Sequence, residues 1–227
     1  KDAIGEDKES DMIKAVIFDM DGVLIDSEPA NLQLIFDFFA LSGKHADETY
    51  LQSLVGRSFK DTWPLTLAAW GEAITPSEYQ SRFGEYRQAH PLDYPSLLFD
   101  GVKELLAWLK EAGYVLAVAS STQLDVVKKV MVDCGIMNYF DAIISGADCK
   151  HSKPDPEIYL RAADTLHIPV AQCVAIEDSA AGMESAHRAG MKVIAKIDDR
   201  YGANAGMADA KVDEMLEIKT IVQAGLE

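Results

Sequence analysis

Short apolar runs recur along the chain and form its main pattern. Each run is apolar at nearly every position, which is typical of a strand that is covered on both faces. We therefore expect five buried β-strands. They lie at residues 15–18, 115–119, 142–144, 174–176 and 192–197.

Between these runs, apolar residues recur at the three- and four-residue spacing of a helix. The pattern through Leu105 and Leu109 stops at Gly113, and a glycine commonly ends a helix. Further helical patterns cover residues 126–131, 158–166 and 180–189. The alternation of strands and helices predicts an α/β fold, namely a Rossmann-like, doubly wound parallel sheet.

The interval between the first two strands is too long for one strand–helix–strand unit. Such a unit needs ~30 residues, whereas about 100 residues separate Asp19 from the end of the second strand. The surplus is helical in pattern, with one face formed by Leu32, Ile35, Phe36 and Phe39. We expect an all-helical cap domain at 30–97, inserted between movable joints into a core domain of 12–29 and 98–227. A helical subdomain that never moves is the alternative.

Composition narrows the possible partners. The chain has 37 acidic and 21 basic residues and a formal charge of −16, which repels nucleic acid and anionic membranes. The three cysteines lack metal-type spacing, so we expect reduced thiols. Residues 1–11 are polar and are expected to form a flexible tail, and no apolar run is long enough to span a membrane. A cytoplasmic monomer that binds neither nucleic acid nor membrane is expected.

Two carboxylates, Asp19 and Asp21, stand directly after the first strand. In an extended segment, residues i and i+2 point to the same side, so both can address one metal ion or one substrate. Gly22 then lets the chain turn away from that face. Because ligands bind beyond the carboxyl ends of the strands in open parallel sheets, this position predicts an active site.

The ends of the other strands also carry polar residues. The second strand ends in three hydroxyl residues, Ser120, Ser121 and Thr122, which could hold phosphate oxygens together with backbone N–H groups. Lys153 lies in the loop after the third strand, and the fourth strand ends in Glu177 and Asp178. We expect all of them along one edge of the sheet.

This set of residues suits phosphoryl transfer through an aspartyl phosphate. Asp19 can attack phosphorus when a divalent cation and a lysine offset the repulsion between two anions. Asp21 would protonate the leaving oxygen and then deprotonate the attacking water. Hard oxygen donors favour Mg²⁺, with Asp19 and Asp178 as its side-chain ligands and Glu177 as a direct or water-mediated one.

Each feature alone has a simpler explanation. A calcium loop is excluded because its glycine would stand at position six, whereas Gly22 stands at position four. A solvated turn remains open for the Asp19 segment, a helix N-cap for Ser120, a surface lysine for Lys153 and a helix cap for the acidic pair at Glu177. The order of all four at successive strand ends favours the functional interpretation.

These motifs resemble those of the haloacid dehalogenase superfamily, in its branch of helical-cap enzymes similar to β-phosphoglucomutase and small phosphate-ester phosphatases. Asp19-Met-Asp21-Gly-Val matches the first motif, Ser120 the second, Lys153 the third and Glu177-Asp178-Ser179 the fourth. The resemblance implies a Rossmann-like core, Mg²⁺, an aspartyl-phosphate intermediate and a cap that closes over the substrate. It also implies that the main-chain carbonyl of Asp21 binds the metal.

The resemblance leaves the reaction open. Dehalogenase relatives generally lack the second aspartate, so Asp21 favours phosphoryl transfer. β-Phosphoglucomutases carry a histidine at the position of Asn31, and they carry an arginine after a Gly-x-Ser sequence, where this chain has Phe59 after Gly56-Arg57-Ser58. We therefore expect a Mg²⁺-dependent phosphatase of a small phosphomonoester, such as a sugar phosphate. The alternatives are a sugar phosphomutase, in which Arg57 substitutes, and a binding or regulatory protein without turnover.

Substrate recognition is expected to come from both domains. On the core side, Gly22, Ser121 and Thr122 are candidates. In the cap, Asn31, Arg57 and Arg82 are candidates, and a solvated cation is the alternative for each arginine. The cap tryptophans are expected in its core, with sugar stacking as the alternative.

Overall fold

The computed structural model describes residues 12–55, 59–201 and 207–226, with backbone only for Lys60 and Tyr201. The chain forms two compact units. One contains the described residues up to Asp26 and from Tyr94 onward, and the other runs from Ser27 to Asp93.

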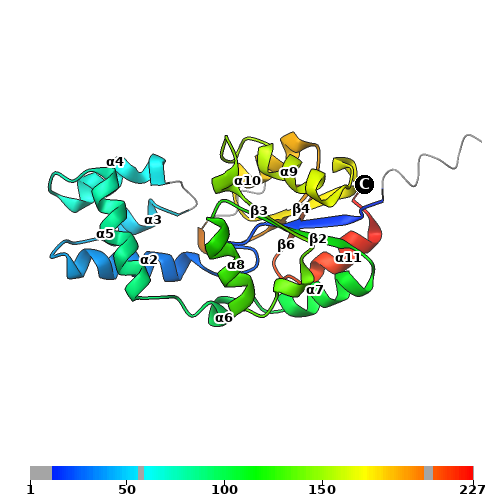
Figure 1. Cartoon of the computed structure of the whole chain (residues 1–227), viewed down its shortest axis with the longest axis horizontal. Coiled ribbons are helices and arrows are strands. Elements are labelled where there is room, and N and C mark those ends of the chain that lie inside the picture. Colours follow the sequence, from blue (N-terminus) through cyan, green and yellow to red (C-terminus); the bar gives the residue numbers. More distant parts are fainter. Residues whose placement is uncertain (1–11, 56–58, 202–206, 227) are drawn as a thin grey trace, which may run out of the picture. The chain divides into compact units, whose positions relative to one another are not determined.

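A six-stranded sheet, parallel throughout, forms the centre of the first unit (Figure 1). Its spatial order is β3-β2-β1-β4-β5-β6. The strands are β1 (Ala15–Phe18), β2 (Val115–Ser120), β3 (Ala142–Ser145), β4 (Cys173–Glu177), β5 (Lys192–Lys196) and β6 (Ala210–Val212). The predicted Rossmann-like α/β fold is confirmed. The short strand β6 was not expected, because three residues with a lysine at the centre form no apolar run.

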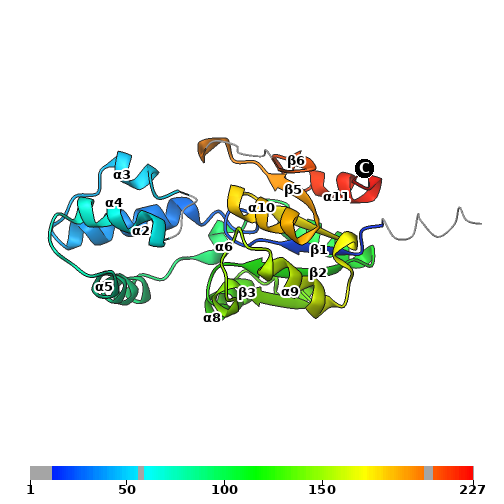
Figure 2. The same ribbon diagram turned by 90° about the horizontal axis from the view of Figure 1, so that it is seen from above.

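Helices connect the strands of this unit. They are α6 (Tyr94–Leu97), α7 (Val102–Glu111), α8 (Leu124–Asp133), α9 (Glu157–Leu166), α10 (Ala180–Ala189) and α11 (Glu217–Ala224), with 3₁₀ turns η1 (Met137–Tyr139), η2 (Gly146–Asp148), η3 (Val170–Gln172) and η4 (Asp199–Tyr201). Buried residues of α7, α8 and α11 cover one face of the sheet, and those of α9 and α10 cover the other. Figures 1 and 2 show α9 and α10 together on their side of the sheet.

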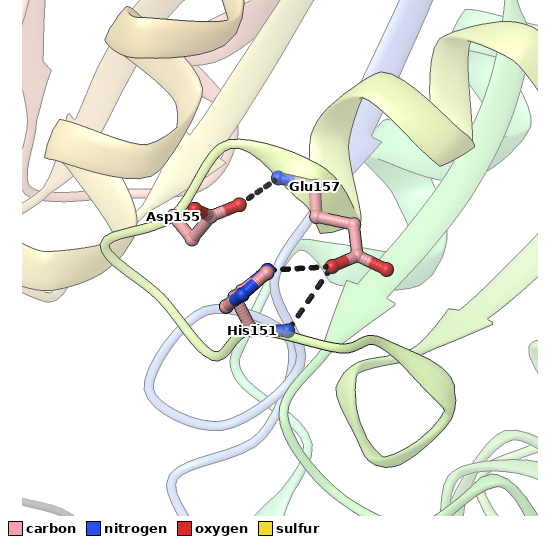
Figure 3. A group of neighbouring side chains, drawn as sticks. All are labelled: His151, Asp155 and Glu157. Atoms are coloured by element: carbon pink, nitrogen blue, oxygen red, sulfur yellow. Dashed lines mark hydrogen bonds and ion pairs between the residues drawn. The ribbon is translucent and has the colours of Figure 1, made fainter.

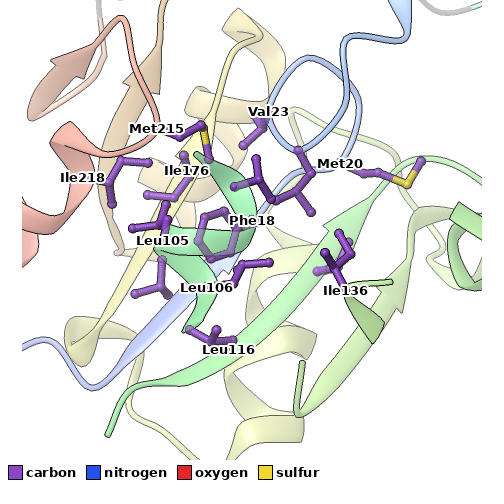
Figure 4. Packing of buried hydrophobic residues seen from close by; sticks show 14 of the residues in the cluster. Phe18, Met20, Val23, Leu105, Leu106, Leu116, Ile136, Ile176, Met215 and Ile218 are labelled. Carbon is purple, nitrogen blue, oxygen red and sulfur yellow. The ribbon is translucent and has the colours of Figure 1, made fainter. Parts of the chain in front are cut away.

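Strand β1 is buried on both faces. Val16 and Phe18 pack on the side of α7, whereas Ala15 and Ile17 pack on the side of α9. Figure 4 shows Phe18 packed among the leucines of α7 and the neighbouring strands. Complete burial of a side chain such as Phe18 contributes about 1.5–3 kcal/mol. The packing therefore fixes the carboxyl end of β1, where the candidate chemistry begins.

The two linkers that lead out of this unit are paired with each other. Ile25 and Leu98 form an antiparallel bridge, and the Asp26 N–H donates to the Leu97 carbonyl oxygen at 2.7 Å. The Arg200 guanidinium binds both carboxylate oxygens of Asp26 at 2.9 Å. The root of the insertion is therefore held within the sheet unit.

The second unit is helical and has an aromatic core. Its helices are α2 (Glu28–Leu41), α3 (Glu48–Gln52), α4 (Phe59–Trp70) and α5 (Pro76–Ala89). The core is formed by Phe38, Phe39, Ala46, Tyr50, Trp70 and Tyr79, with Trp63 partly buried against it. The expected face of α2 is partly wrong, since Phe36 is 40% exposed and the buried residues are Leu34, Phe38 and Phe39. Apolar residues surround most of this helix, so spacing alone does not select a face.

Within the described residues, no helix combines the length and the apolar character that crossing a membrane requires.

Candidate active site

Asp19 stands one residue beyond β1, at the carboxyl edge of the sheet. Its backbone N–H donates to the Ile176 carbonyl oxygen at 3.0 Å, so pairing with β4 continues to this residue. The Met20 carbonyl oxygen then accepts from the N–H groups of Leu24 and Ile25, at 2.9 and 3.1 Å, which closes a tight loop. Pairing and loop together fix the backbone of Asp19, which is buried.

Gly22 lies in this loop with a φ of +80°, a conformation that glycine adopts without strain. A Cβ atom at this position would overlap the carboxylate of Asp178. The glycine therefore lets Asp178, which follows β4, lie against the loop that carries Asp21.

Lys153 connects the ends of β1 and β4. Its Nζ donates to Asp19 Oδ1 and to Glu177 Oε1, both at 2.6 Å, and to the Ala119 carbonyl oxygen at 3.1 Å. The exposed fractions of the three charged side chains are only 8%, 11% and 0% for lysine, aspartate and glutamate. Hydrogen bonds between charged groups are strong where water is excluded. The lysine therefore holds a positive charge directly against Asp19.

The loop that carries Lys153 is held by acidic side chains close to it in sequence (Figure 3). The Glu157 carboxylate accepts from the backbone N–H groups of Lys150 and His151 at 2.9 to 3.0 Å. Asp155 Oδ1 accepts from the Glu157 N–H at 3.0 Å. His151, Asp155 and Glu157 form a group of possible metal-ligand atoms, but these contacts with the loop and the start of α9 account for the positions of both acidic residues.

Glu177 is fully buried, and both oxygens of its carboxylate are engaged. Oε1 accepts from Lys153 and from the Tyr159 hydroxyl, the latter at 2.7 Å. Oε2 accepts from the N–H groups of Asp178 and Ser179, both at 3.2 Å, and from the Ser179 hydroxyl at 3.1 Å. This arrangement gives no support to the expectation of Glu177 as a direct metal ligand, because its oxygens already bind the lysine and the turn after β4.

The end of β2 holds Asp21. The Thr122 hydroxyl donates to Asp21 Oδ2 at 3.0 Å, and the Thr122 N–H donates to Ser120 Oγ at 3.1 Å. Ser145, at the end of β3, donates its hydroxyl to the Thr122 carbonyl oxygen at 2.8 Å. Ser121 is exposed in the same turn. The structure thus joins the ends of β1, β2 and β3 through Thr122.

Burial raises the pKa values of two carboxyl groups in the site. The pKa of Asp19 rises to about 7 because burial removes water, the Lys153 ammonium opposes this rise, and the charges of Glu177 and Asp21 add to it. The pKa of Asp178 rises to about 8 through burial and the charges of Glu177 and Asp19. Although burial alone would lower the pKa of Lys153, its two carboxylate partners raise it well above the ordinary value. Burial is thus the largest cause of both raised carboxyl pKa values, and the neighbouring carboxylates add to it.

The donor set fits a divalent cation. Asp19 and Asp178 offer hard carboxylate oxygens, and burial, the largest cause of their raised pKa values, disfavours their ionised forms until a cation is near. Mg²⁺ is typically bound by one or two carboxylates, with water and phosphate oxygens completing its coordination. Asp178 lies against the loop that carries Asp21, and these two aspartates, Asp19 and Asp178, could hold Mg²⁺ while Glu177 stays bound to Lys153.

Two of the predicted substrate residues belong to the helical unit, and a third is not among the described residues. Asn31 is partly buried near the start of α2, in the helical unit. Arg82 pairs with Glu78 one turn earlier on α5, at 2.5 Å. Arg57 lies outside the described residues. The roles of these three residues stay predictions.

Sequence reasoning missed two residues that shape the site. Tyr159 fits the apolar face of α9, and nothing in that spacing indicates that its hydroxyl reaches Glu177. Gly182 lies inside α10, where a Cβ atom would overlap the Glu177 carboxylate. A glycine in a helix interior costs ~1 kcal/mol relative to alanine, so its presence was an available signal of close packing.

The sequence and the fold are similar to those of known proteins. The profile of a family described as haloacid dehalogenase-like hydrolase matches residues 16–196. Hexitol phosphatase B from Escherichia coli (strain K12) is 31% identical over 91% of this chain and 94% of its own. The phosphorylated carbohydrates phosphatase of Thermotoga maritima is 30% identical over 88% and 89%. A crystal structure from Thermotoga maritima, provisionally described as a β-phosphoglucomutase, has a TM-score of 0.77 at 29% identity, and the match covers 92% of this chain and 99% of that one.

Proposed function

The chain belongs to the family of haloacid dehalogenase-like hydrolases, and on this basis we propose that it is a Mg²⁺-dependent phosphatase of small phosphomonoesters, in particular sugar phosphates. The family match confirms the predicted family, and this match together with the phosphatase relatives confirms the prediction of an enzyme. The observation that carries the proposal is the buried contact between Lys153 and Asp19, at a sheet edge that also holds Asp21. Similarity to the two carbohydrate-type phosphatases supports a sugar phosphate as substrate.

In the first step, a carboxylate oxygen of Asp19 forms a bond to phosphorus while the ester P–O bond breaks. The Lys153 ammonium offsets the negative charge that would otherwise keep carboxylate and phosphate apart. Asp21 gives a proton to the leaving oxygen of the alcohol. The Thr122 hydroxyl, bound to Asp21 Oδ2, orients that carboxyl group.

In the second step, the aspartyl phosphate is hydrolysed. Asp21, now a carboxylate, takes a proton from a water molecule whose oxygen attacks phosphorus. The bond between Asp19 and phosphorus breaks, which releases inorganic phosphate and restores the carboxylate. The proton that Asp21 receives prepares it for the next substrate.

Bound Mg²⁺ supplies positive charge to the phosphoryl oxygens. Asp19, Asp178 and the main-chain carbonyl of Asp21 would hold it, and Glu177 would hold Lys153. The backbone N–H groups and hydroxyls at Ser120 and Ser121 would bind phosphate oxygens. In this proposal the helical unit acts as a cap whose residues, including Asn31, contact the rest of the substrate.

A sugar phosphomutase is the second candidate. The similarity to the structure provisionally described as a β-phosphoglucomutase favours it. Against the mutase, this chain has Asn31 at the position where β-phosphoglucomutases carry a histidine. Hexose-phosphate interconversion, primed by a bisphosphate and faster than phosphate release, would establish the mutase and overturn the phosphatase.

The experiment that tests the phosphatase is a panel of phosphate esters, with Mg²⁺ and with EDTA, that measures released phosphate. We expect turnover of sugar phosphates in the presence of Mg²⁺ and none in the presence of EDTA. Asp19→Asn should abolish it, because an amide is a poor nucleophile, whereas Asp164→Asn on the exposed side of α9 should leave it unchanged. Absence of turnover on the whole panel, or full activity of Asp19→Asn, would overturn the proposal.

A further inference from the structure

Tyr159 contacts both members of the buried ion pair between Lys153 and Glu177. Its side chain is 0% exposed. The hydroxyl donates to Glu177 Oε1 at 2.7 Å, and Lys153 Nζ lies 3.4 Å from the hydroxyl oxygen and 5.1 Å from the ring centroid. The hydroxyl therefore lies beside the ion pair and bonds to the same glutamate oxygen that Lys153 contacts.

Two carboxylates compete for the Lys153 ammonium. Asp19 Oδ1 and Glu177 Oε1 both lie 2.6 Å from Nζ, but only the glutamate oxygen also accepts the Tyr159 hydroxyl. An acceptor whose charge is partly offset by a second donor attracts the first donor less strongly. The hydroxyl therefore weakens the attraction of the ammonium to Glu177 relative to Asp19.

We propose that Tyr159 is a positioning residue that acts through Glu177 to keep the Lys153 ammonium against Asp19. The inference rests on the proposed function, in which Asp19 is the nucleophile. Without the hydroxyl, Glu177 Oε1 would draw the ammonium toward itself. Charge compensation at Asp19 would then decrease, while the surfaces that bind the rest of the substrate would stay the same.

The kinetic test uses Tyr159→Phe, which keeps the ring and removes only the hydroxyl. We expect kcat to fall about tenfold, since a hydrogen bond to a charged group is lost, and KM to change less than twofold. The matched control is Tyr114→Phe, just before β2 at the opposite edge of the sheet, which should behave like the wild type. A kcat of Tyr159→Phe within twofold of the wild type, or an equal loss in the control, would overturn the inference.

A double-mutant cycle tests whether the effect passes through Glu177. In a Glu177→Gln background, Tyr159→Phe should lower kcat less than twofold further, because the charged acceptor is already absent. A full tenfold loss in that background would show that Tyr159 acts independently of Glu177, and would overturn the inference.

A readout that needs no activity separates this inference from the proposed function. The ¹⁵N resonance of the Lys153 ammonium, assigned with Lys153→Arg, should shift in Tyr159→Phe and stay in place in Tyr114→Phe. In the Glu177→Gln background, the shift caused by Tyr159→Phe should be largely lost. An unchanged resonance in Tyr159→Phe would overturn the inference even if the enzyme proves to be a phosphatase, whereas an inactive wild type with a shifted resonance would overturn only the proposed function.

Discussion

The two units of the molecule bury different kinds of groups. The sheet unit buries carboxylates, Asp19 and Glu177, around the ammonium of Lys153. In the helical unit, the buried polar side chains among the described residues are hydroxyls, as at Thr62 and Thr66, and none is charged. The difference shows where the molecule can hold ionised groups away from water.

The carboxyl edge of a parallel sheet provides the partners that buried charges need. Both buried carboxylates of the sheet unit receive hydrogen bonds, Asp19 from Lys153 and Glu177 from Lys153 and the turn at Ser179. The helical unit has no such edge and fills its core with rings, for example Phe39 against Trp70 with centroids 5.2 Å apart. The buried charged groups named here therefore belong to the sheet unit, and the buried core of the helical unit is aromatic.

Removal of one lysine from each unit should give the largest contrast. Lys153→Met leaves two buried carboxylates without their partner, so we expect activity to fall at least about 1000-fold and the free energy of unfolding to fall by about 3–5 kcal/mol. Lys44→Met removes a pair with Glu72, which is 71% exposed, and a contact with the Trp70 ring, so we expect unchanged activity and a loss of at most about 1 kcal/mol in the free energy of unfolding. Phosphate release and urea unfolding measure the two effects. Similar losses at both sites would remove the distinction between the units.

Adding one methyl group to each unit should give opposite effects. Gly182→Ala places a Cβ atom into the Glu177 carboxylate, so we expect a loss of about 1–3 kcal/mol in stability and a clear loss of kcat. Gly84→Ala on α5 meets no atom within 4 Å and should stabilise the helix by about 1 kcal/mol. Thermal unfolding and phosphate release provide the comparison. A stabilising effect of Gly182→Ala would show that Glu177 is free to move.

The smallest expected effect is a pH dependence of stability that originates in the sheet unit. The folded-state pKa of Asp178 is about 8, above its ordinary value of 3.8, so the folded protein holds a proton that the unfolded chain releases. The stability that this group contributes is therefore fully present below the unfolded-state pKa of 3.8, and it is lost as pH rises to the folded-state pKa of about 8. Without Mg²⁺, the melting temperature should be a few degrees lower at pH 8 than at pH 6.

The control for this prediction is Asp178→Asn, which removes one of the two carboxyl groups with a raised pKa and should reduce the difference between pH 6 and pH 8, leaving the part that comes from Asp19 with its pKa of about 7. Added Mg²⁺ should also reduce it, because the cation favours the ionised carboxylate. If the wild type and Asp178→Asn show the same dependence, another group is responsible.

Much of the sheet could be predicted because its strands are buried on both faces. Such strands appear as apolar runs, and β1 was predicted to its exact ends. The edge strand β6 was missed, because an exposed Lys211 interrupts its apolar residues. In the helical unit, Phe36 was assigned to the wrong side of α2, because apolar residues on most sides of the helix leave the buried face to be decided by packing.

The site was predictable in its charged residues and less so in their partners. Strand ends place Asp19 and Asp178 at one edge of the sheet, and the loop between β3 and α9 brings Lys153 to the same edge. The sequence does not indicate how Glu177 divides its oxygens, since that depends on Tyr159 from α9 and on the turn at Ser179. Side chains that serve as partners have no motif of their own, and only their geometry identifies them.

The pairing of Ile25 with Leu98 has a consequence for how such a molecule can change over evolutionary time. Because the bridge holds both linkers together, a segment inserted between them closes a loop whose ends already touch. The entropic cost of closing a loop grows only slowly with its length, so the stability of the sheet unit depends little on the length of the inserted segment. The segment from Ser27 to Asp93 is in this sense an interchangeable module, whose replacement would leave the fold of the sheet unit unchanged.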